Sequence, residues 1–353
     1  MASGAAKAPS KIAKLLSISH DKDVDGLNSA AIVRRYAKSK GLKHEVILTD
    51  YGGFEKVFGK VAAYRNTLII VTDLGMDETE LDKVYDGLSR AIAQGCRVVW
   101  LDHHQWSDTS AKRILSLGNK TVLKINHEYC AAEIAFKVLM PRDEISEELA
   151  RIAHDTDFNH REIEVANALT DALSVIRFGA LDRREDLTEA LKSLLTSLAD
   201  EGVSGVWDEP TKRFKDSLLS KRIDHYRKDR MKKMKKALAG HNDIEIHERL
   251  VRILEMPSGV TTTDIGTFLS NPETLRVLGD DLRVADLLIS VSQGGMLGFR
   301  RGSERVLCNG AAGLFNGGGH PYAAGGEYGM YDDFQAVCDD IALTLSKNTD
   351  WIA

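Results

Sequence analysis

Residues 97–106 read RVVWLDHHQW, in which a run of strand-forming residues meets Asp102, His103 and His104 in direct succession. Neighbouring side chains on a β-strand point to opposite faces of the sheet. Three adjacent polar side chains therefore cannot all face one pocket while the strand stays regular. Either these residues are polar side chains on the surface, or the strand ends here at a functional site.

Three further segments share this pattern, because each is a short apolar run that ends in, or meets, an Asp or a His. The four segments are KLLSIS (14–19), EVILT (45–49), TLIIVTD (67–73) and RVVWLD (97–102). They alternate with longer amphipathic stretches, which is typical of a parallel sheet covered by helices. Open α/β sheets bind ligands beyond the carboxyl ends of their strands, so we expect these polar ends to meet in one site.

The middle of the chain, from about 140 to 240, has no convincing strand pattern and is predicted to be helical. Helical periodicity is visible near 133–139 and at 187–200, and residues 212–240 form a strongly basic run. We interpret the basic run mainly as a solvated helix that connects two domains, since a run of charged residues usually lies on a solvent-exposed face. The alternative is that residues 212–236 form a cationic wall near an anionic substrate.

Strand patterns return after Gly240, at 249–256, 285–292 and 296–301. The expected fold class is therefore α/β, with an N-terminal parallel-sheet domain, a helical linker and a smaller C-terminal α/β domain. The expected boundaries are 12–160 for the first domain, 161–242 for the basic connector and 243–353 for the second domain.

The composition fits a globular protein with two cores, because the chain has 353 residues and 43% of them are hydrophobic. The net charge of -5 gives no general attraction for nucleic acid. The four cysteines form no CxxC pair, which argues against a zinc knuckle or a disulfide framework. No stretch reaches the roughly 18 apolar residues of a membrane span. We expect a soluble, cytoplasmic protein with no membrane partner, and a homodimer stays open.

The loop after the first strand carries a histidine and several carboxylates. In SHDKDVDG (19–26), His20, Asp23 and Asp25 lie where a helix is expected to begin. Asp is a common helix cap, and capping explains any one of these residues. It does not explain the whole group, whose mutual repulsion would be costly without cations.

Asp73 at the end of the third strand and Asp155 in IAHDTDF extend this group, with His154 and Asp157 beside Asp155. The combined set provides two imidazoles and four carboxylates, which are His20, Asp23, Asp25, Asp73, His103 and Asp155. Such a set can hold two divalent cations if one carboxylate bridges them. Mixed imidazole and carboxylate ligands favour Mn²⁺, with Mg²⁺ or Co²⁺ as alternatives. Two such ions suit hydrolysis of phosphoesters or phosphoanhydrides.

The order of the motifs resembles the DHH phosphoesterase superfamily, in the RecJ-like and nanoRNase branch that carries a DHH-associated C-terminal domain. The motifs are HDKDVDG (20–26), VTD (71–73), LDHH (101–104), HDTDF (154–158) and GGGHPYAAGG (317–326). The resemblance covers the chain to about residue 160 and its last hundred or so residues. The basic helical middle is not covered.

The resemblance implies a role for each residue of the first domain. His20 and Asp23 would hold one metal, with Asp73 as the bridge. The second metal would be held by Asp25, His103 and Asp155. Catalytic roles would fall to His104, which would face the substrate phosphate, and to Asp102, which would orient an imidazole.

Two positions depart from the usual family pattern. The spacing from His20 to Asp23 is short, so Asp21 could share the first metal instead. Asp157 stands where the fourth motif usually has glycine, which adds a charge whose role the pattern does not define.

The glycine motif of the second domain implies substrate binding. Gly317, Gly318 and Gly319 expose backbone amides that can approach a phosphate or sugar closely, and His320 adds a polar group. By resemblance, these residues and Arg300 would grip the far end of a short nucleotide chain.

We therefore expect a metal-dependent enzyme that hydrolyses short RNA or single-stranded DNA to nucleoside monophosphates. Three alternatives stay open. The protein could be a RecJ-like exonuclease on longer strands, a phosphatase of small nucleotides such as phosphoadenosine phosphate or a cyclic dinucleotide, or a non-catalytic relative associated with replication. The complete ligand set argues against the last alternative.

Overall fold

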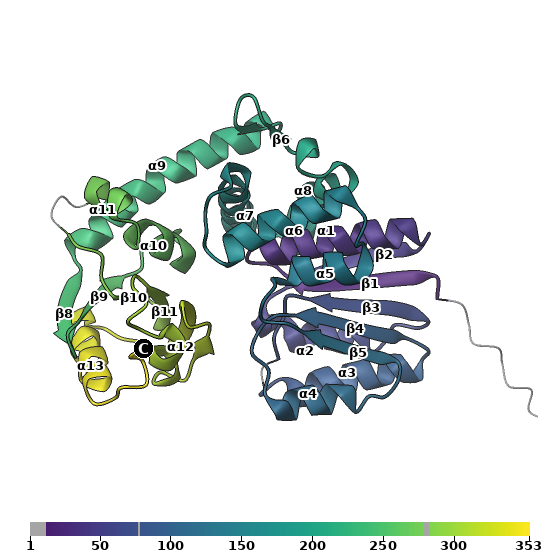
Figure 1. Cartoon of the computed structure of the whole chain (residues 1–353), viewed down its shortest axis with the longest axis horizontal. Coiled ribbons are helices and arrows are strands. Elements are labelled where there is room, and N and C mark those ends of the chain that lie inside the picture. Colours follow the sequence, from purple (N-terminus) through teal and green to yellow (C-terminus); the bar gives the residue numbers. More distant parts are fainter. Residues whose placement is uncertain (1–11, 77, 279–281) are drawn as a thin grey trace, which may run out of the picture. The chain divides into compact units, whose positions relative to one another are not determined.

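The structure is a computed structural model that describes residues 12–76, 78–278 and 282–353. The chain forms two compact units, one ending at Ile223 and the other starting at Asp224. Each unit has its own sheet and is described separately (Figure 1).

The first unit is built on a five-stranded sheet with the strand order β2-β1-β3-β4-β5. All neighbouring strands are parallel. The strands are β1 (Lys14–His20), β2 (Lys43–Thr49), β3 (Thr67–Thr72), β4 (Arg97–Asp102) and β5 (Thr121–Ile125). The four predicted strands are confirmed. β5 was not predicted, and its side chains alternate between buried and exposed, as expected for a strand at the edge of the sheet.

Helices cover both faces of this sheet (Figure 1). One face carries α1 (Val24–Ser39), α5 (Ala131–Leu139) and α6 (Glu144–Asp157), and the other carries α2 (Phe54–Val61), α3 (Leu81–Ala93) and α4 (Asp108–Leu115). The apolar residues of β4 point into these layers, and Trp100 is fully buried and stacks on Phe58 of α2 with ring centroids 5.9 Å apart. The α/β fold predicted for this part of the chain is confirmed.

The first unit continues beyond the boundary expected at residue 160. Two helices, α7 (Glu164–Arg183) and α8 (Leu187–Glu201), pack against α1. They are followed by the 3₁₀ turn η2 (Val203–Gly205) and a short hairpin of β6 (Trp207–Asp208) and β7 (Arg213–Phe214). A second 3₁₀ turn, η1 (Tyr51–Gly53), lies between β2 and α2. Much of the expected connector is therefore part of the first unit, because α8 has an apolar face that α1 and β2 cover.

The second unit contains a six-stranded mixed sheet with the order β12-β13-β11-β10-β9-β8. Its strands are β8 (Asn242–Ile246), β9 (Arg249–Glu255), β10 (Leu287–Val291), β11 (Met296–Arg301), β12 (Gly318–Gly319) and β13 (Ala323–Glu327). Its helices are α10 (Thr262–Leu269), α11 (Pro272–Leu278), α12 (Cys308–Gly313) and α13 (Phe334–Ser346). The basic run forms helix α9 (Ser217–Ala239), and the division between the two units falls within it.

Among the residues that the structure describes, every helix is too short or too polar to cross a membrane.

An ion pair joins three helices on one side of the first unit. The Arg35 guanidinium of α1 makes two hydrogen bonds to the Asp143 carboxylate, at 2.7 and 2.6 Å, and a third to the carbonyl of Ala199 at 2.6 Å. Asp143 also caps the N-terminus of α6 by accepting from the amide of Ser146. The Arg35 hydrogen bonds lower the pKa of Asp143 to about 2.

Asp143→Asn keeps a capping oxygen but removes the charge, so we expect the free energy of unfolding at pH 7 to fall by about 1–2 kcal/mol. The folded pKa of Asp143 is depressed, so its contribution is present above the unfolded pKa of about 3.9 and is lost as the pH falls toward 2. Urea unfolding of the parent and the variant should show a constant difference from pH 7 to 5, and a smaller one below about pH 4. Asp108→Asn, at an exposed i,i+4 pair with Lys112, is the matched control and should change little. A difference independent of pH would contradict the assignment.

Candidate active site

The carboxyl ends of four neighbouring parallel strands bring polar side chains together. His20 ends β1, Asp50 follows β2, Asp73 follows β3, and Asp102 ends β4 with His103 next to it. His20, Asp73, Asp102 and His103 are all buried. The regular strand β4 stops at Asp102, so the alternation of side chains no longer applies to His103 and His104.

Asp73 lies between two histidines from different strands. Its Oδ2 is 3.6 Å from Nδ1 of His20, and its Oδ1 is 3.3 Å from Nε2 of His103. The backbone of Asp73 is left-handed, with φ at 57°, and only 2% of the residue is exposed. Such a conformation is uncommon for a residue with a Cβ and persists where the surroundings impose it. The strand end therefore holds the two carboxylate oxygens in a defined position.

Asp25 is fixed by the start of helix α5. Its two carboxylate oxygens accept hydrogen bonds from the amides of Ala131 and Ala132, at 2.8 and 2.7 Å. A helix N-terminus favours an anion, which explains how a carboxylate that is only 1% exposed can be held here. Oδ2 of Asp25 also lies 3.7 Å from Nε2 of His103.

The fourth motif contributes Asp157 to this group rather than the expected Asp155. Oδ2 of Asp157 is 3.5 Å from Nδ1 of His103, and one ligand atom from each of Asp25, His103 and Asp157 lies within 4.8 Å of the others. Asp155 instead accepts hydrogen bonds from the amides of Glu162 and Ile163. The loop that follows α6 thus engages both carboxylate oxygens of Asp155, and its role as a metal ligand stays a prediction.

A second group forms around His20. Its Nδ1 is 2.7 Å from Oδ2 of Asp23, whose other oxygen caps α1 by accepting from the amide of Gly26. His20, Asp23 and Asp73 each offer a ligand atom within 4.8 Å of the others. Asp21 is not a member of any such group among the described residues. The geometry therefore favours Asp23 over Asp21 beside His20.

His104 is oriented by Asp102. Nδ1 of His104 lies 2.8 Å from one oxygen of the fully buried Asp102, and the Trp106 indole donates to the other oxygen at 2.6 Å. Gly75 makes room for this imidazole, because a Cβ there would lie 2.9 Å from Cβ of His104. The imidazole that Asp102 contacts is that of His104, and its orienting role in catalysis stays a prediction.

The crowding of acidic groups shifts their proton affinities. Burial, together with the charges of Asp73 and Asp157, raises the pKa of Asp25 well above its ordinary value. Burial also raises the pKa of Asp157 to about 6, although His103 opposes the shift. For His103, burial favours the neutral ring, but Asp73, Asp157 and Asp25 outweigh it and raise the pKa to about 11. In the protein alone, protons on these groups therefore reduce the repulsion between the buried carboxylates. Bound divalent cations would reduce the same repulsion.

The donor atoms fit divalent cations. Four buried atoms of the motif residues have no hydrogen-bond partner among the described residues, and they are Nε2 of His20, Oδ1 of Asp21, Oδ2 of Asp73 and Oδ2 of Asp157. Buried polar atoms are nearly always partnered in native structures, so atoms of this kind commonly mark the place of a bound ion or ligand. Imidazole nitrogen and carboxylate oxygen together suit Mn²⁺ and similar ions.

The sequence analysis missed Asp50. Its Oδ1 lies 3.6 Å from Nε2 of His20, and its Oδ2 pairs with the Lys22 ammonium. The available signal was the one used for Asp73, an Asp directly after an apolar strand. Asp50 was missed because it also caps the turn between β2 and η1, where its side chain accepts a hydrogen bond from the amide of Tyr51.

The family model for the DHH family, N-terminal domain, matches residues 15–165. Residues 15–165 therefore form a domain of the DHH family. The matched range contains all the metal-ligand candidates described above. A search of curated protein sequences finds no match.

Several solved structures share this fold. An exopolyphosphatase-related protein from Bacteroides fragilis is 13% identical, with a TM-score of 0.53, over 96% of this chain and 93% of that chain. RecJ from Thermus thermophilus in complex with Mn²⁺ is 18% identical, with a TM-score of 0.59, over 96% of this chain but 53% of that one. Exonuclease RecJ bound to manganese is 17% identical, with a TM-score of 0.51, over 95% and 89% of the two chains.

The residues predicted to bind substrate in the second unit lie on β11, on β12 and directly beside β12, and β13 separates the two strands. Arg300 on β11 donates to the Thr262 hydroxyl at 3.1 Å and to the carbonyl of Phe299 at 2.9 Å. A Cβ on Gly317 would lie 2.0 Å from the carbonyl oxygen of Gly325, and Gly319 has φ at 140°, so close packing and backbone geometry require these two glycines. Gly318 faces open space. The His320 ring stacks on Tyr322 with centroids 5.1 Å apart.

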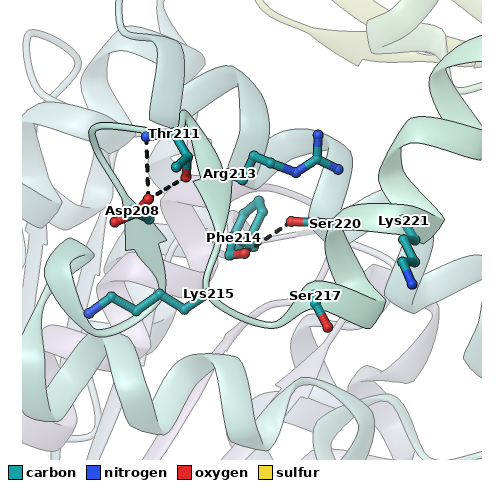
Figure 2. Close-up of a pocket in the computed structure, with 8 residues that line it drawn as sticks. All are labelled: Asp208, Thr211, Arg213, Phe214, Lys215, Ser217, Ser220 and Lys221. Atoms are coloured by element: carbon teal, nitrogen blue, oxygen red, sulfur yellow. Dashed lines mark hydrogen bonds between the residues drawn. The ribbon is translucent and has the colours of Figure 1, made fainter.

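A hollow of about 420 Å³ lies in the first unit, at the β6–β7 hairpin and the start of α9 (Figure 2). Arg213 and Lys221 lie on one side of Phe214 and Lys215 extends to the other, while Asp208 is engaged by Thr211 (Figure 2). The predicted metal and catalytic residues do not line this hollow.

The different contacts of Asp157 and Asp155 predict different effects on metal binding. Asp157→Asn should lose about one equivalent of tightly bound Mn²⁺, because it removes a charged oxygen from the group around His103. Asp155→Asn should keep the stoichiometry but lose about 1–3 kcal/mol of stability, because an amide cannot accept both loop hydrogen bonds. Isothermal titration and thermal unfolding measure these effects. If Asp155→Asn loses Mn²⁺ and Asp157→Asn does not, then Asp155 is the metal ligand, as the sequence predicted.

Proposed function

We propose that the protein is a metal-dependent phosphodiesterase that hydrolyses short single-stranded RNA or DNA to nucleoside monophosphates. The observation that carries the proposal is the position of Asp73, whose two oxygens face the His20 group and the His103 group. The DHH-family domain supports a phosphoester hydrolase that uses divalent cations.

Two groups of side chains would hold the cations. The first is His20, Asp23 and Asp73, and the second is Asp25, His103 and Asp157, with Asp73 close to both. When bound there, two cations would lower the pKa of a water molecule and offset negative charge on the phosphate oxygens. Mn²⁺ is the ion that these ligands favour, with Mg²⁺ and Co²⁺ as alternatives.

His104 would contact the substrate phosphate. Burial favours the neutral ring of His104, but Asp102, which engages Nδ1, outweighs burial and raises the pKa of the ring, so the imidazolium form would donate from Nε2 to a phosphate oxygen. Trp106 and Gly75 hold the pair in place from two sides. A donor fixed in advance stabilises the growing charge of the transition state without reorganising during the reaction.

The second unit would provide a binding site for a nucleotide. The exposed backbone at Gly318 can approach a phosphate or sugar closely, while Arg300 and His320 would add polar contacts. A small gripping site of this kind favours short oligonucleotides over long strands, which are usually held by extended basic grooves and stacking platforms.

The experiment is a length series of 5′-labelled oligoribonucleotides, from two to about twenty nucleotides, with Mn²⁺ and the parent protein or Asp73→Ala. We expect dinucleotides to be hydrolysed efficiently by the parent. Asp73→Ala should lose at least about 10³-fold in rate, since it removes the carboxylate between both groups. Circular dichroism should show that the variant is folded.

Asp86→Ala, at an exposed position of helix α3 outside the site, is the control and should keep the parent rate. Survival of dinucleotides while twenty-mers disappear would contradict the preference for short substrates. Normal turnover by Asp73→Ala would contradict the role of its carboxylate.

A RecJ-like activity on longer single strands is the second candidate. It is supported by the hollow near α9, where Arg213 and Lys221 provide positive charge within one unit (Figure 2). Cations that track a phosphate backbone make binding weaker as the salt concentration rises.

If this second candidate holds, Arg213→Gln combined with Lys221→Gln should weaken the binding of twenty-mers and leave dinucleotide turnover unchanged. The slope of the logarithm of the binding constant against the logarithm of the salt concentration should fall by about two phosphate contacts. Fluorescence anisotropy over a salt series measures the slope. Lys112→Gln combined with Arg113→Gln, on α4, removes the same charge elsewhere and is the control. An unchanged slope in the Arg213 and Lys221 variant would exclude the hollow as a strand-binding site.

A further inference from the structure

Three aromatic rings gather at the end of helix α6, and none of them has a role in the metal groups. The rings belong to His154, Phe158 and His160. His160 is exposed, while His154 and Phe158 are partly exposed. A cluster that served only core packing would be buried, so the exposure of these rings calls for another explanation.

The rings form a platform rather than a column. Their centroids are 4.5 Å apart for His154 and Phe158, 5.3 Å for His154 and His160, and 6.4 Å for Phe158 and His160. The planes differ by 21–30°. In a straight column the two outer rings would be much farther apart than 6.4 Å. The three rings therefore lie partly side by side with nearly parallel faces.

Contacts with the metal groups hold the platform in place. Nδ1 of His154 lies 2.8 Å from Oε2 of Glu133, and the same oxygen accepts from the amide of Cys130 at 3.0 Å. The next two amides of that helix start bind Asp25. Phe158 directly follows Asp157, which contacts His103. The rings are thus fixed to the same elements that fix the metal ligands.

Asp155 organises the loop that carries His160. Its carbonyl accepts from the amide of His160 at 3.0 Å, and its carboxylate accepts from the amides of Glu162 and Ile163. Asn159 and Arg161, on either side of His160, both have left-handed backbones with φ at 58° and 61°. Uncommon conformations of this kind are maintained where a loop must keep one shape. The buried carboxylate of Asp155 thus acts as a positioning group for the platform.

We propose that the platform formed by His154, Phe158 and His160 stacks the nucleobase of the nucleotide on the 5′ side of the scissile phosphodiester. This inference rests on the proposed phosphodiesterase function and specifies its substrate as one that bears a base. Aromatic faces bind any base, because every base has a π surface, and each stacked base contributes about 1–3 kcal/mol. The platform therefore gives affinity for nucleotides without selecting a sequence.

The test compares two substrates that share one phosphodiester, a dinucleotide with both bases and the same dinucleotide with an abasic 5′ residue. For His160→Ala and Phe158→Leu we expect KM for the base-bearing substrate to rise about 10-fold, with kcat little changed. KM for the abasic substrate should stay near that of the parent. His160→Tyr, which restores an aromatic face, should recover most of the affinity.

Tyr85→Leu, on α3, removes an aromatic ring elsewhere in the first unit and is the control. Its kinetics should match the parent on both substrates. Unchanged KM in His160→Ala and Phe158→Leu would overturn the inference, and so would an equal loss on the base-bearing and abasic substrates. Neither result would affect the proposed hydrolase.

A binding measurement keeps the two proposals separate if the parent hydrolyses neither substrate. A dinucleotide carrying 2-aminopurine at its 5′ residue should lose fluorescence on binding to Asp73→Ala, because stacking quenches this base. The quenching should be absent when His160→Ala is added. If the fluorescence is quenched but the parent hydrolyses neither substrate, the result contradicts the phosphodiesterase proposal and leaves the platform proposal intact. Quenching that persists in the His160→Ala background would contradict the platform.

Discussion

The two oxygens of one carboxylate, that of Asp73, connect the parts of this site. One oxygen faces His20 at the end of β1, and the other faces His103 after β4. β3 lies between those two strands in the sheet, so the residue after β3 is the one that can reach both neighbours. The left-handed backbone of Asp73 turns the chain at that point, and the sheet order and the strained turn together determine where the carboxylate lies.

The remaining acidic residues add charge to a site that is already crowded. Asp25 receives support from the α5 amides, Asp102 from Trp106 and His104, and Asp23 from Gly26 and His20. Asp157 has a buried oxygen with no hydrogen-bond partner among the described residues. Burying several carboxylates together is unfavourable unless cations or protons neutralise them. The arrangement fits a site for divalent cations, and we propose that it holds two of them, with His104 facing an anionic substrate.

The sequence predicted the four central strands, because each is a continuous apolar run whose polar end marks the ligand edge of the sheet. It also predicted the positions of His20, Asp73 and His103 at those ends. For the fourth motif it predicted Asp155 as the ligand, whereas Asp157 is the residue that lies beside His103. Two positions along a helix differ by about 200° in direction, so only one of these side chains faces the site, and the motif does not say which. The role of Asp50 was missed because Asp50 also caps a turn. Strands β12 and β13 of the second unit were missed because their glycines do not give a strand pattern.

Anomalous diffraction from crystals soaked with Mn²⁺ tests the central claim most directly, because it locates the ions without reference to activity. The account predicts two manganese peaks roughly 3.5–4 Å apart, with one Asp73 oxygen on each, His20 at one ion and His103 at the other. A single peak, or two peaks of which neither contacts Asp73, would contradict it.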